Sequence, residues 1–287
     1  MARSALALLF CLVERGTSLN LLQWNPHWEC FAQESACKLE AESFLSETLK
    51  AQNVDFANLI MLEDDAFSLP TGWQQVGHLC GKDSLALIFN SGRWALGSSS
   101  KVGCLAPDDR PYVIQSFVPN KGSGWSEEVV VVGAHAPHRP VVSWDNLRDD
   151  LTVVMASSKV ERVIVIADTN QEQSVGSASI MEDLGVYTGS VVSSELKNSC
   201  CYSGFQDKYI HAFDRVMANF GDMQSTTMLL DPLPGWARSK TMHKPISTRL
   251  DWGVPTPLLP SRVVAFILIL LISALLLSRC CRICNRR

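Results

Sequence analysis

Two apolar stretches decide the fold of this chain: VVVVGAHAP at residues 129–137 and VIVIADTNQ at residues 163–171. Each contains a short run of β-branched residues and then ends in polar side chains. Short apolar runs of this kind predict strands that are buried on both faces of a sheet. Because polar residues at the ends of buried strands can meet at one site, we expect His135 and Asp168 to belong to the same functional site.

Further strands and a few helices are predicted on either side of these two stretches. The sequence favours strands at residues 19–24, 56–62, 85–89 and 111–118, a short strand within 211–218, and helices at 29–49 and 144–156. Hydrophobic residues make up 47% of the 287 residues, and 8 Trp and 11 Phe indicate a packed core rather than a disordered chain. The body is therefore expected to be of the α/β (α+β) class.

Polar side chains that could support chemistry follow several of these strands. They are Asn25 after the first strand, Glu63 after the second, His135, the pair Asp168 and Asn170, and Asp214 together with His243. Taken singly, each also has an ordinary structural explanation: a turn residue, a solvated acid or a buried histidine with a partner. Their order and spacing along the chain are more specific than any one of them.

That order resembles the endonuclease/exonuclease/phosphatase family over residues 19–252, nearly the whole body. The resemblance is carried by LLQWN (21–25), IMLED (60–64), the strand start at Arg110, VVVVGAHAP, VIVIADTNQ, FDRVMAN (213–219) and MHKPI (242–246). It implies a four-layer α/β/β/α sandwich, with two sheets face to face and helices outside. It also implies divalent-metal-dependent cleavage of a phosphoester.

Positions that match the family's motifs take roles in metal binding and water activation. The resemblance implies that Glu63 is the direct ligand of Mg²⁺, or of Mn²⁺ or Ca²⁺, and that Asn25 helps to hold the ion. Asp168 would orient the attacking water, and Asn170 would contact the phosphate. Hard divalent cations prefer oxygen donors of this kind.

Other matching positions take roles in moving protons and in balancing the charge of the phosphate. His243, held by Asp214, would be a general base or a phosphate-stabilising group. His135 would protonate the leaving oxygen or bind the phosphate, with Asp83 orienting its ring. Arg110 would neutralise the phosphate.

One departure from the family pattern affects the expected activity. The residue before the final histidine is usually an acid and is here Met242, whose thioether is a poor ligand for Mg²⁺. In addition, Ala167 replaces the Gly of the family's usual Gly-Asp-x-Asn motif, and Leu62 replaces the Gln that often precedes the metal-binding Glu. The competing hypothesis is a catalytically degenerate relative that binds a ligand or a partner at the membrane.

The two ends of the chain read as targeting segments. Residues 1–18 are typical of a signal peptide, 19–253 form the body, and 254–261 form a Pro-rich stalk. Residues 262–279 hold 16 uncharged residues between two arginines and predict one C-terminal transmembrane helix. The basic, Cys-rich tail at 280–287 favours the cytoplasmic side, so the body is expected to be extracellular or luminal.

The charge balance of the chain bears on the class of substrate that it is expected to bind. Residues 1–261 carry 20 basic and 29 acidic side chains. This balance argues mildly against long nucleic acids and leaves nucleic acid, phospholipid or inositol phosphate open as the phosphate-ester substrate. No obligate protein partner is indicated.

Six cysteines remain in the body, and in an oxidising compartment they suggest disulfides. Proximity in sequence favours the pairs Cys30–Cys37 and Cys80–Cys104. We do not expect the adjacent residues Cys200 and Cys201 to bond to each other.

Overall fold

The computed structural model describes residues 18–28, 30, 35–62, 68–138, 143–231 and 243–252. The predicted stalk, transmembrane helix and tail lie outside these ranges, as do all but the last residue of the predicted signal peptide. Within the described ranges, none of the helices combines the length and apolar character needed to cross a bilayer.

The first sheet has six strands in the order β13-β14-β1-β2-β4-β3. Their bounds are Met223–Leu229, Ile246–Trp252, Ser18–Trp24, Phe56–Leu62, Asp83–Asn90 and Trp73–Cys80. Strands β1 and β2 run parallel, and the other neighbours are antiparallel. The predicted strands 19–24, 56–62 and 85–89 are thereby confirmed.

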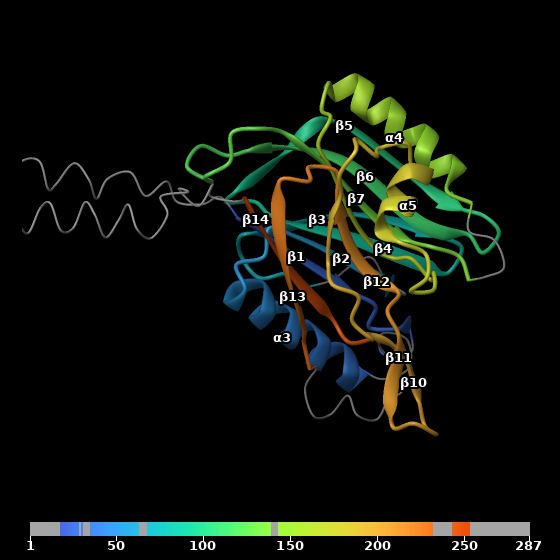
Figure 1. The fold of residues 1–287 in the computed structure, drawn as a ribbon. Helices are drawn as coiled ribbons and strands as arrows, with labels where there is room; N and C mark the ends of the chain where they lie inside the picture. Colours follow the sequence, from blue (N-terminus) through green and yellow to red (C-terminus); the bar gives the residue numbers. More distant parts are fainter. Residues whose placement is uncertain are drawn as a thin grey trace, which may run out of the picture. The chain divides into compact units, whose positions relative to one another are not determined.

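The second sheet has six strands in the order β5-β6-β7-β8-β12-β9. Their bounds are Trp94–Leu105, Arg110–Pro119, Val129–His135, Val163–Asp168, Asp214–Ala218 and Val192–Ser193. Strands β7 and β8, which hold the two deciding stretches, run parallel and are fully buried, as their unbroken apolar runs predict. A separate hairpin of β10 (Cys200–Ser203) and β11 (Lys208–His211) extends beyond the sheets (Figure 1).

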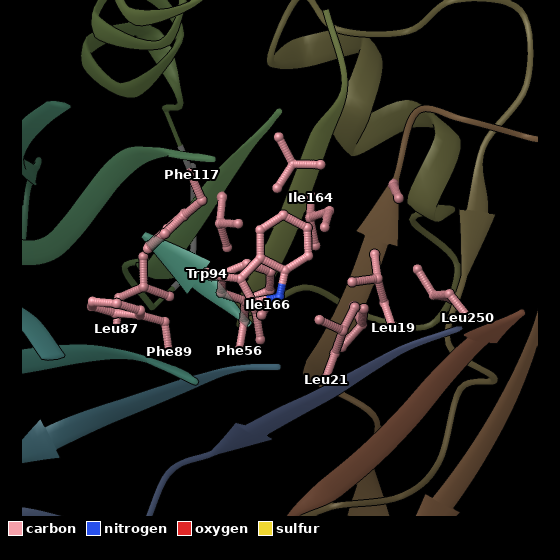
Figure 2. Packing of buried hydrophobic residues seen from close by; sticks show 14 of the residues in the cluster. Leu19, Leu21, Phe56, Leu87, Phe89, Trp94, Phe117, Ile164, Ile166 and Leu250 are labelled. Atoms are coloured by element: carbon pink, nitrogen blue, oxygen red, sulfur yellow. The ribbon is translucent and has the colours of Figure 1, made fainter. Parts of the chain in front are cut away.

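The two sheets pack face to face around one large apolar core. Phe56 and Leu250 from the first sheet and Phe117 and Ile164 from the second belong to this core, together with Trp94 (Figure 2). Aromatic rings pack against one another across it at tilted angles: the centroids of Phe56 and Phe117 lie 4.8 Å apart, with 54° between the ring planes.

Helices cover the outer faces of both sheets (Figure 1). Helix α3 (Ser35–Ala51) packs Leu45 and Leu49 against the first sheet, whereas α4 (Asp145–Ser158) and α5 (Ser177–Asp183) pack against the second. The layers are therefore helix, sheet, sheet and helix, as expected for the body. The predicted helix at 29–49 has described bounds of 35–51, and the one at 144–156 has bounds of 145–158.

Three disulfides are present among the described cysteines. Cys30–Cys37 and Cys80–Cys104 confirm the pairs favoured by proximity. The expectation for Cys200 and Cys201 was wrong, because these adjacent residues are bonded to each other. Successive side chains of a regular strand point to opposite faces. Here Cys201 has a left-handed φ of 64°, which departs from strand geometry and lets both sulfur atoms lie on one side.

Candidate active site

Strand register brings three of the predicted site residues into one row. His135 lies opposite Asp168 across β7 and β8, and Asp168 lies opposite Asp214 across β8 and β12. Residues that face each other across paired strands point to the same side of a sheet. The row therefore delivers one imidazole and two carboxylates to the space at the end of these strands, all almost completely buried.

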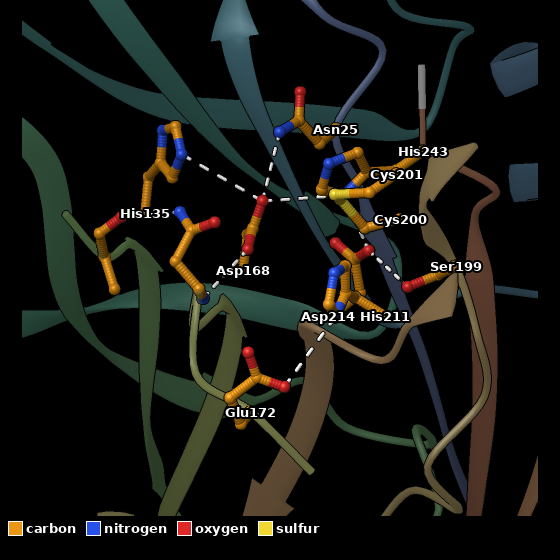
Figure 3. Close-up of a disulfide and its surroundings, with 12 residues drawn as sticks. Asn25, His135, Asp168, Glu172, Ser199, Cys200, Cys201, His211, Asp214 and His243 are labelled. Carbon is orange, nitrogen blue, oxygen red and sulfur yellow. Dashed lines mark hydrogen bonds and ion pairs between the residues drawn. A yellow bond between two sulfur atoms is a disulfide. The ribbon is translucent and has the colours of Figure 1, made fainter. Parts of the chain in front are cut away.

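Asp168 is the centre of this group (Figure 3). One carboxylate oxygen, Oδ2, accepts a hydrogen bond from Asn25 Nδ2 at 3.1 Å and lies 3.5 Å from His243 Nδ1 and 4.0 Å from His135 Nε2. The other, Oδ1, accepts from the backbone N–H of Asn170 at 3.1 Å. Burial alone would raise the pKa of Asp168, but the neighbouring His243 and His135 hold that pKa below its usual range.

His243 is fixed by Asp214, as the sequence predicts. Its Nδ1 lies 2.8 Å from Asp214 Oδ2, and the same oxygen accepts a hydrogen bond from Ser199 at 2.6 Å. Burial opposes the charged imidazole, but the charges of Asp214 and Asp168 prevail and raise the pKa of His243 to about 9. The ring is therefore an imidazolium near neutral pH.

A polar chain behind Asp214 went unnoticed in the sequence. Gln23 Nε2 donates to Asp214 Oδ1 at 3.0 Å, and Asn58 Nδ2 donates to Gln23 Oε1 at 2.8 Å. Gln23 and Asn58 lie opposite each other in β1 and β2 and are completely buried. The available signal was the presence of amide residues within two mainly apolar strands: Asn20 and Gln23 in LNLLQW and Asn58 in FANLIML. These amides link the first sheet to the site residues of the second.

His135 is held by a second carboxylate, Asp83. Its Nδ1 lies 2.6 Å from Asp83 Oδ2, and Arg110 Nη1 donates to the same oxygen at 3.0 Å. Burial would raise the pKa of Asp83, but His135 and Arg110 hold it below the usual range. An ionised Asp83 requires the proton on Nδ1, and His135 Nε2 has no hydrogen-bond partner among the described residues. That nitrogen faces Asp168 and can exchange a proton with a substrate.

Asn170 completes the row with a strained backbone. Its φ of 47° is left-handed, a conformation that Asn tolerates better than most residues. Nδ2 donates to the carbonyl of Ala136 at 2.8 Å, and Oδ1 is buried without a partner among the described residues. Together with His135 Nε2, this makes two unpartnered buried atoms close to Asp168, a pattern that indicates a polar ligand in this space.

A hard divalent cation fits the donor chemistry of this site. Asp168, Asp214 and His243 each place one ligand atom within 4.8 Å of the others. Asn25 Nδ2 and the backbone N–H of Asn170 both bond to Asp168, and the amide oxygen of Asn170 is buried without a partner among the described residues. Carboxylate and amide oxygens are the preferred ligands of Mg²⁺. The predicted ligand Glu63 lies outside the described residues, as does Met242; β2 ends at Leu62, one residue before Glu63.

A cavity of about 280 Å³ adjoins the His135 side of the site. It is lined by Trp28, Met61, Lys82, Asp83 and Arg110. Arg110 and Lys82 supply positive charge, while Trp28 supplies an aromatic face. The cavity therefore suits an anionic ligand that carries an apolar or planar part.

Known structures share this architecture. No protein-family model matches the chain, and no curated protein matches it by sequence. An endonuclease/exonuclease/phosphatase from Bacteroides vulgatus matches with a TM-score of 0.59 and 11% identity, over 82% of this chain and 99% of the other. TDP2 from C. elegans matches with a TM-score of 0.59 and 12% identity, over 87% and 81%.

The human Nocturnin catalytic domain, solved with a bound sulfate anion, matches with a TM-score of 0.53 and 16% identity, over 83% of this chain and 96% of the other. Likeness at these low identities establishes a common architecture. The chain therefore has the fold of the endonuclease/exonuclease/phosphatase family.

Proposed function

We propose that this chain is a membrane-anchored phosphoesterase that depends on a divalent metal and hydrolyses a phosphodiester or a phosphomonoester. The observation that carries the proposal is the meeting of Asn25, His135, Asp168, Asp214 and His243 in one buried cluster. These residues come from five separate places in the chain. Buried charge assembled from such distant segments is costly, and it is typical of active sites.

The charge state of each group suggests its part in the reaction. The pKa of Asp168 is held below its usual range, so Asp168 is a carboxylate that can accept a hydrogen bond from the attacking water and orient it. His243 carries a proton near neutral pH, since its pKa is about 9, so it serves as a cationic donor to the phosphate rather than as a base. His135 is positioned by Asp83 to protonate the leaving oxygen through Nε2. Arg110 balances the negative charge of the phosphate from the adjoining cavity.

Mg²⁺, or Mn²⁺ or Ca²⁺ in its place, would be held by Asn25 and Glu63, with Asp168 beside it. When bound, such an ion supplies positive charge that stabilises the phosphate oxygens as the bond breaks. The described site residues supply the remaining functions: they orient water, donate protons and exclude solvent.

The anchored arrangement rests on the ends of the chain and on the cysteines. An uncharged run at 263–278, followed by a basic tail, supports a single span with the tail in the cytoplasm. The disulfides Cys30–Cys37 and Cys80–Cys104 fit an oxidising extracellular or luminal compartment. Protease protection of the body in sealed vesicles tests this, and digestion from the cytoplasmic side would contradict it.

A substrate panel tests the catalytic proposal. We expect the full-length chain to hydrolyse a phosphate ester only with added Mg²⁺ or Mn²⁺, and the panel should include an oligonucleotide, a phospholipid and an inositol phosphate. Asp168→Asn and His243→Gln should each lower kcat by about 10²–10⁴-fold. The matched control is Asp231→Asn, which changes an exposed carboxylate that pairs with Lys244.

Two outcomes would count against the enzyme. Absence of metal-dependent turnover on every member of the panel favours the degenerate binding protein, as does turnover that survives Asp168→Asn. Met242→Asp restores the usual acid at that position. A gain of turnover in this variant would show that the remaining groups are competent.

A further inference from the structure

The disulfide between Cys200 and Cys201 lies directly beside the candidate site (Figure 3). The residue before it, Ser199, donates a hydrogen bond to Asp214 at 2.6 Å, and the carbonyl of Ser199 accepts from the backbone N–H of Lys244 at 2.8 Å. These two links tie the base of hairpin β10–β11 to Asp214, which holds His243, and to Lys244, which follows His243 in the chain. A chemical change at these sulfur atoms takes place next to that imidazole.

The two sulfur atoms and His243 form a ligand set of a different kind from the magnesium site. Sγ of Cys200, Sγ of Cys201 and a ring nitrogen of His243 all lie within 4.8 Å of one another. Because Nδ1 bonds to Asp214, Nε2 is the ring nitrogen able to bind a metal, and a carboxylate behind the ring is the usual support for a metal-binding histidine.

Two thiolates and one imidazole favour zinc over magnesium. Zn²⁺ binds Cys and His at about 2.0–2.3 Å, and a Cys₂His set with an open fourth position is a known zinc combination. Hard Mg²⁺ has little affinity for sulfur. While the disulfide is intact, its sulfur atoms are not thiolates and this set is incomplete.

We propose that Cys200, Cys201 and His243 form an inhibitory zinc site that exists only when the Cys200–Cys201 disulfide is reduced. A thiol or phosphine reductant supplies two electrons, the S–S bond breaks, and each sulfur takes up one proton. Zn²⁺ then displaces both thiol protons and the Nε2 proton of the imidazolium, and it binds the two sulfur atoms and Nε2. Because His243 is then held by zinc, its proton is no longer available to a phosphate.

Zinc binding and zinc inhibition are separate consequences of this site. The inhibitory consequence rests on the proposed phosphoesterase function, whereas binding of zinc does not. A chain without any phosphoesterase activity would therefore still show whether the site exists.

Zinc titration of the full-length chain tests the proposal. The three tail cysteines are first replaced, as Cys280→Ser, Cys281→Ser and Cys284→Ser, so that they do not compete. We expect phosphine reduction to add a zinc site that is lost in Cys200→Ser/Cys201→Ser. We also expect zinc to suppress magnesium-dependent hydrolysis at least about 10-fold in the reduced protein and not in the unreduced protein.

A second cysteine–histidine group supplies the matched control. Cys80 and Cys104 lie beside His78 with the same ligand types, but in β3 and β5, which are edge strands of the first and the second sheet. Zinc inhibition of the reduced protein should persist in Cys80→Ser/Cys104→Ser. Inhibition that disappears in this variant and persists in Cys200→Ser/Cys201→Ser would overturn the proposal.

A measurement on the reduced protein with all its body cysteines in place removes any dependence on how the variants fold. After reduction, zinc should protect Cys200 and Cys201 from alkylation, as read by mass spectrometry of the peptide that contains both. Equal alkylation with and without zinc would refute the site. If zinc protects the two cysteines from alkylation but does not reduce hydrolysis, zinc binding at this site is supported and the inhibitory role of zinc is refuted.

Discussion

Replacing Asp214 with Asn tests whether a buried charge pair holds His243 in place. The surroundings raise the pKa of His243 from 6.5 to about 9. At about 1.4 kcal/mol per unit, that shift corresponds to about 3 kcal/mol of preference for the folded imidazolium. Asp214 is the larger of the two attractive charges, and Asp168 remains in the variant. We therefore expect Asp214→Asn to remove about 2 kcal/mol of that stabilisation.

The sign of the pH dependence follows from a folded pKa that lies above the unfolded one. Below about pH 6.5 the imidazole is protonated in both states, so the stabilisation is fully present. It is lost as the pH rises through about 9, where the folded imidazole also loses its proton. The difference in unfolding free energy between wild type and Asp214→Asn should therefore shrink across that window.

Urea unfolding of the full-length chain at about pH 6, 7.5 and 9.5 measures this difference. Asp231→Asn serves as the control, because its carboxylate is 82% exposed and its pair with Lys244 should add little at any pH. A penalty for Asp214→Asn that is the same at about pH 6 and pH 9.5 would refute the reasoning. NMR titration of His243 supplies an independent reading, and its pKa should fall in the variant.

Two further predictions concern the packing that supports the site. Gly133→Ala should cost about 1–3 kcal/mol of stability, because a Cβ there would lie 2.5 Å from Asn58 Oδ1. The control is Gly204→Ala, which should be nearly neutral because its Cβ would have no atom within 4 Å among the described residues. Equal thermal unfolding temperatures of the two variants would contradict this prediction. Arg93→Met should cost about 3 kcal/mol above neutral pH, because it removes the cation beside the buried Asp55 carboxylate and leaves only the hydrogen bonds from Asn20 N and Trp94 Nε1 among the described residues. Burial already raises the pKa of Asp55 to about 6 despite Arg93, and loss of Arg93 raises that pKa further. The penalty should therefore fall as the pH is lowered towards about 6 and vanish below it, and a penalty that is constant from about pH 5 to 8 in urea titrations would count against it.

The strands that sequence patterns predicted are mainly those in the middle of the sheets. β7 and β8 carry continuous apolar runs, and β2 an apolar run interrupted by Asn58, because both faces of these strands are covered. The strands at the four sheet edges, β13, β3, β5 and β9, were missed. β5 shows why: WALGSSSKVGCL is half exposed and holds two glycines and three serines, so no apolar run marks it.

The residues of the candidate site were easier to predict from the sequence than the residues that hold them in place. Asp168 and His135 end apolar strands, so their position in sequence reveals their position in space. Gln23 and Asn58 lie inside strands, and nothing in their spacing indicates that they pair across β1 and β2 and reach Asp214. The disulfide between Cys200 and Cys201 depends on the left-handed backbone conformation of Cys201, which the residue types in this stretch do not predict.

The row of His135, Asp168 and Asp214 has a consequence for how this protein can diverge. The hydrogen-bonded pairing of the strands sets the spacing of these residues, because neighbouring strands lie about 4.8 Å apart. The connecting segments do not affect this spacing. Those segments can lengthen, shorten or be exchanged while the distances between the reactive groups stay constant. A single-residue insertion inside β8 would instead turn Asp168 to the opposite face of the sheet and remove it from the candidate site. Changes in ligand specificity are therefore expected to arise in the loops, while β7, β8 and β12 keep the spacing of the site residues fixed.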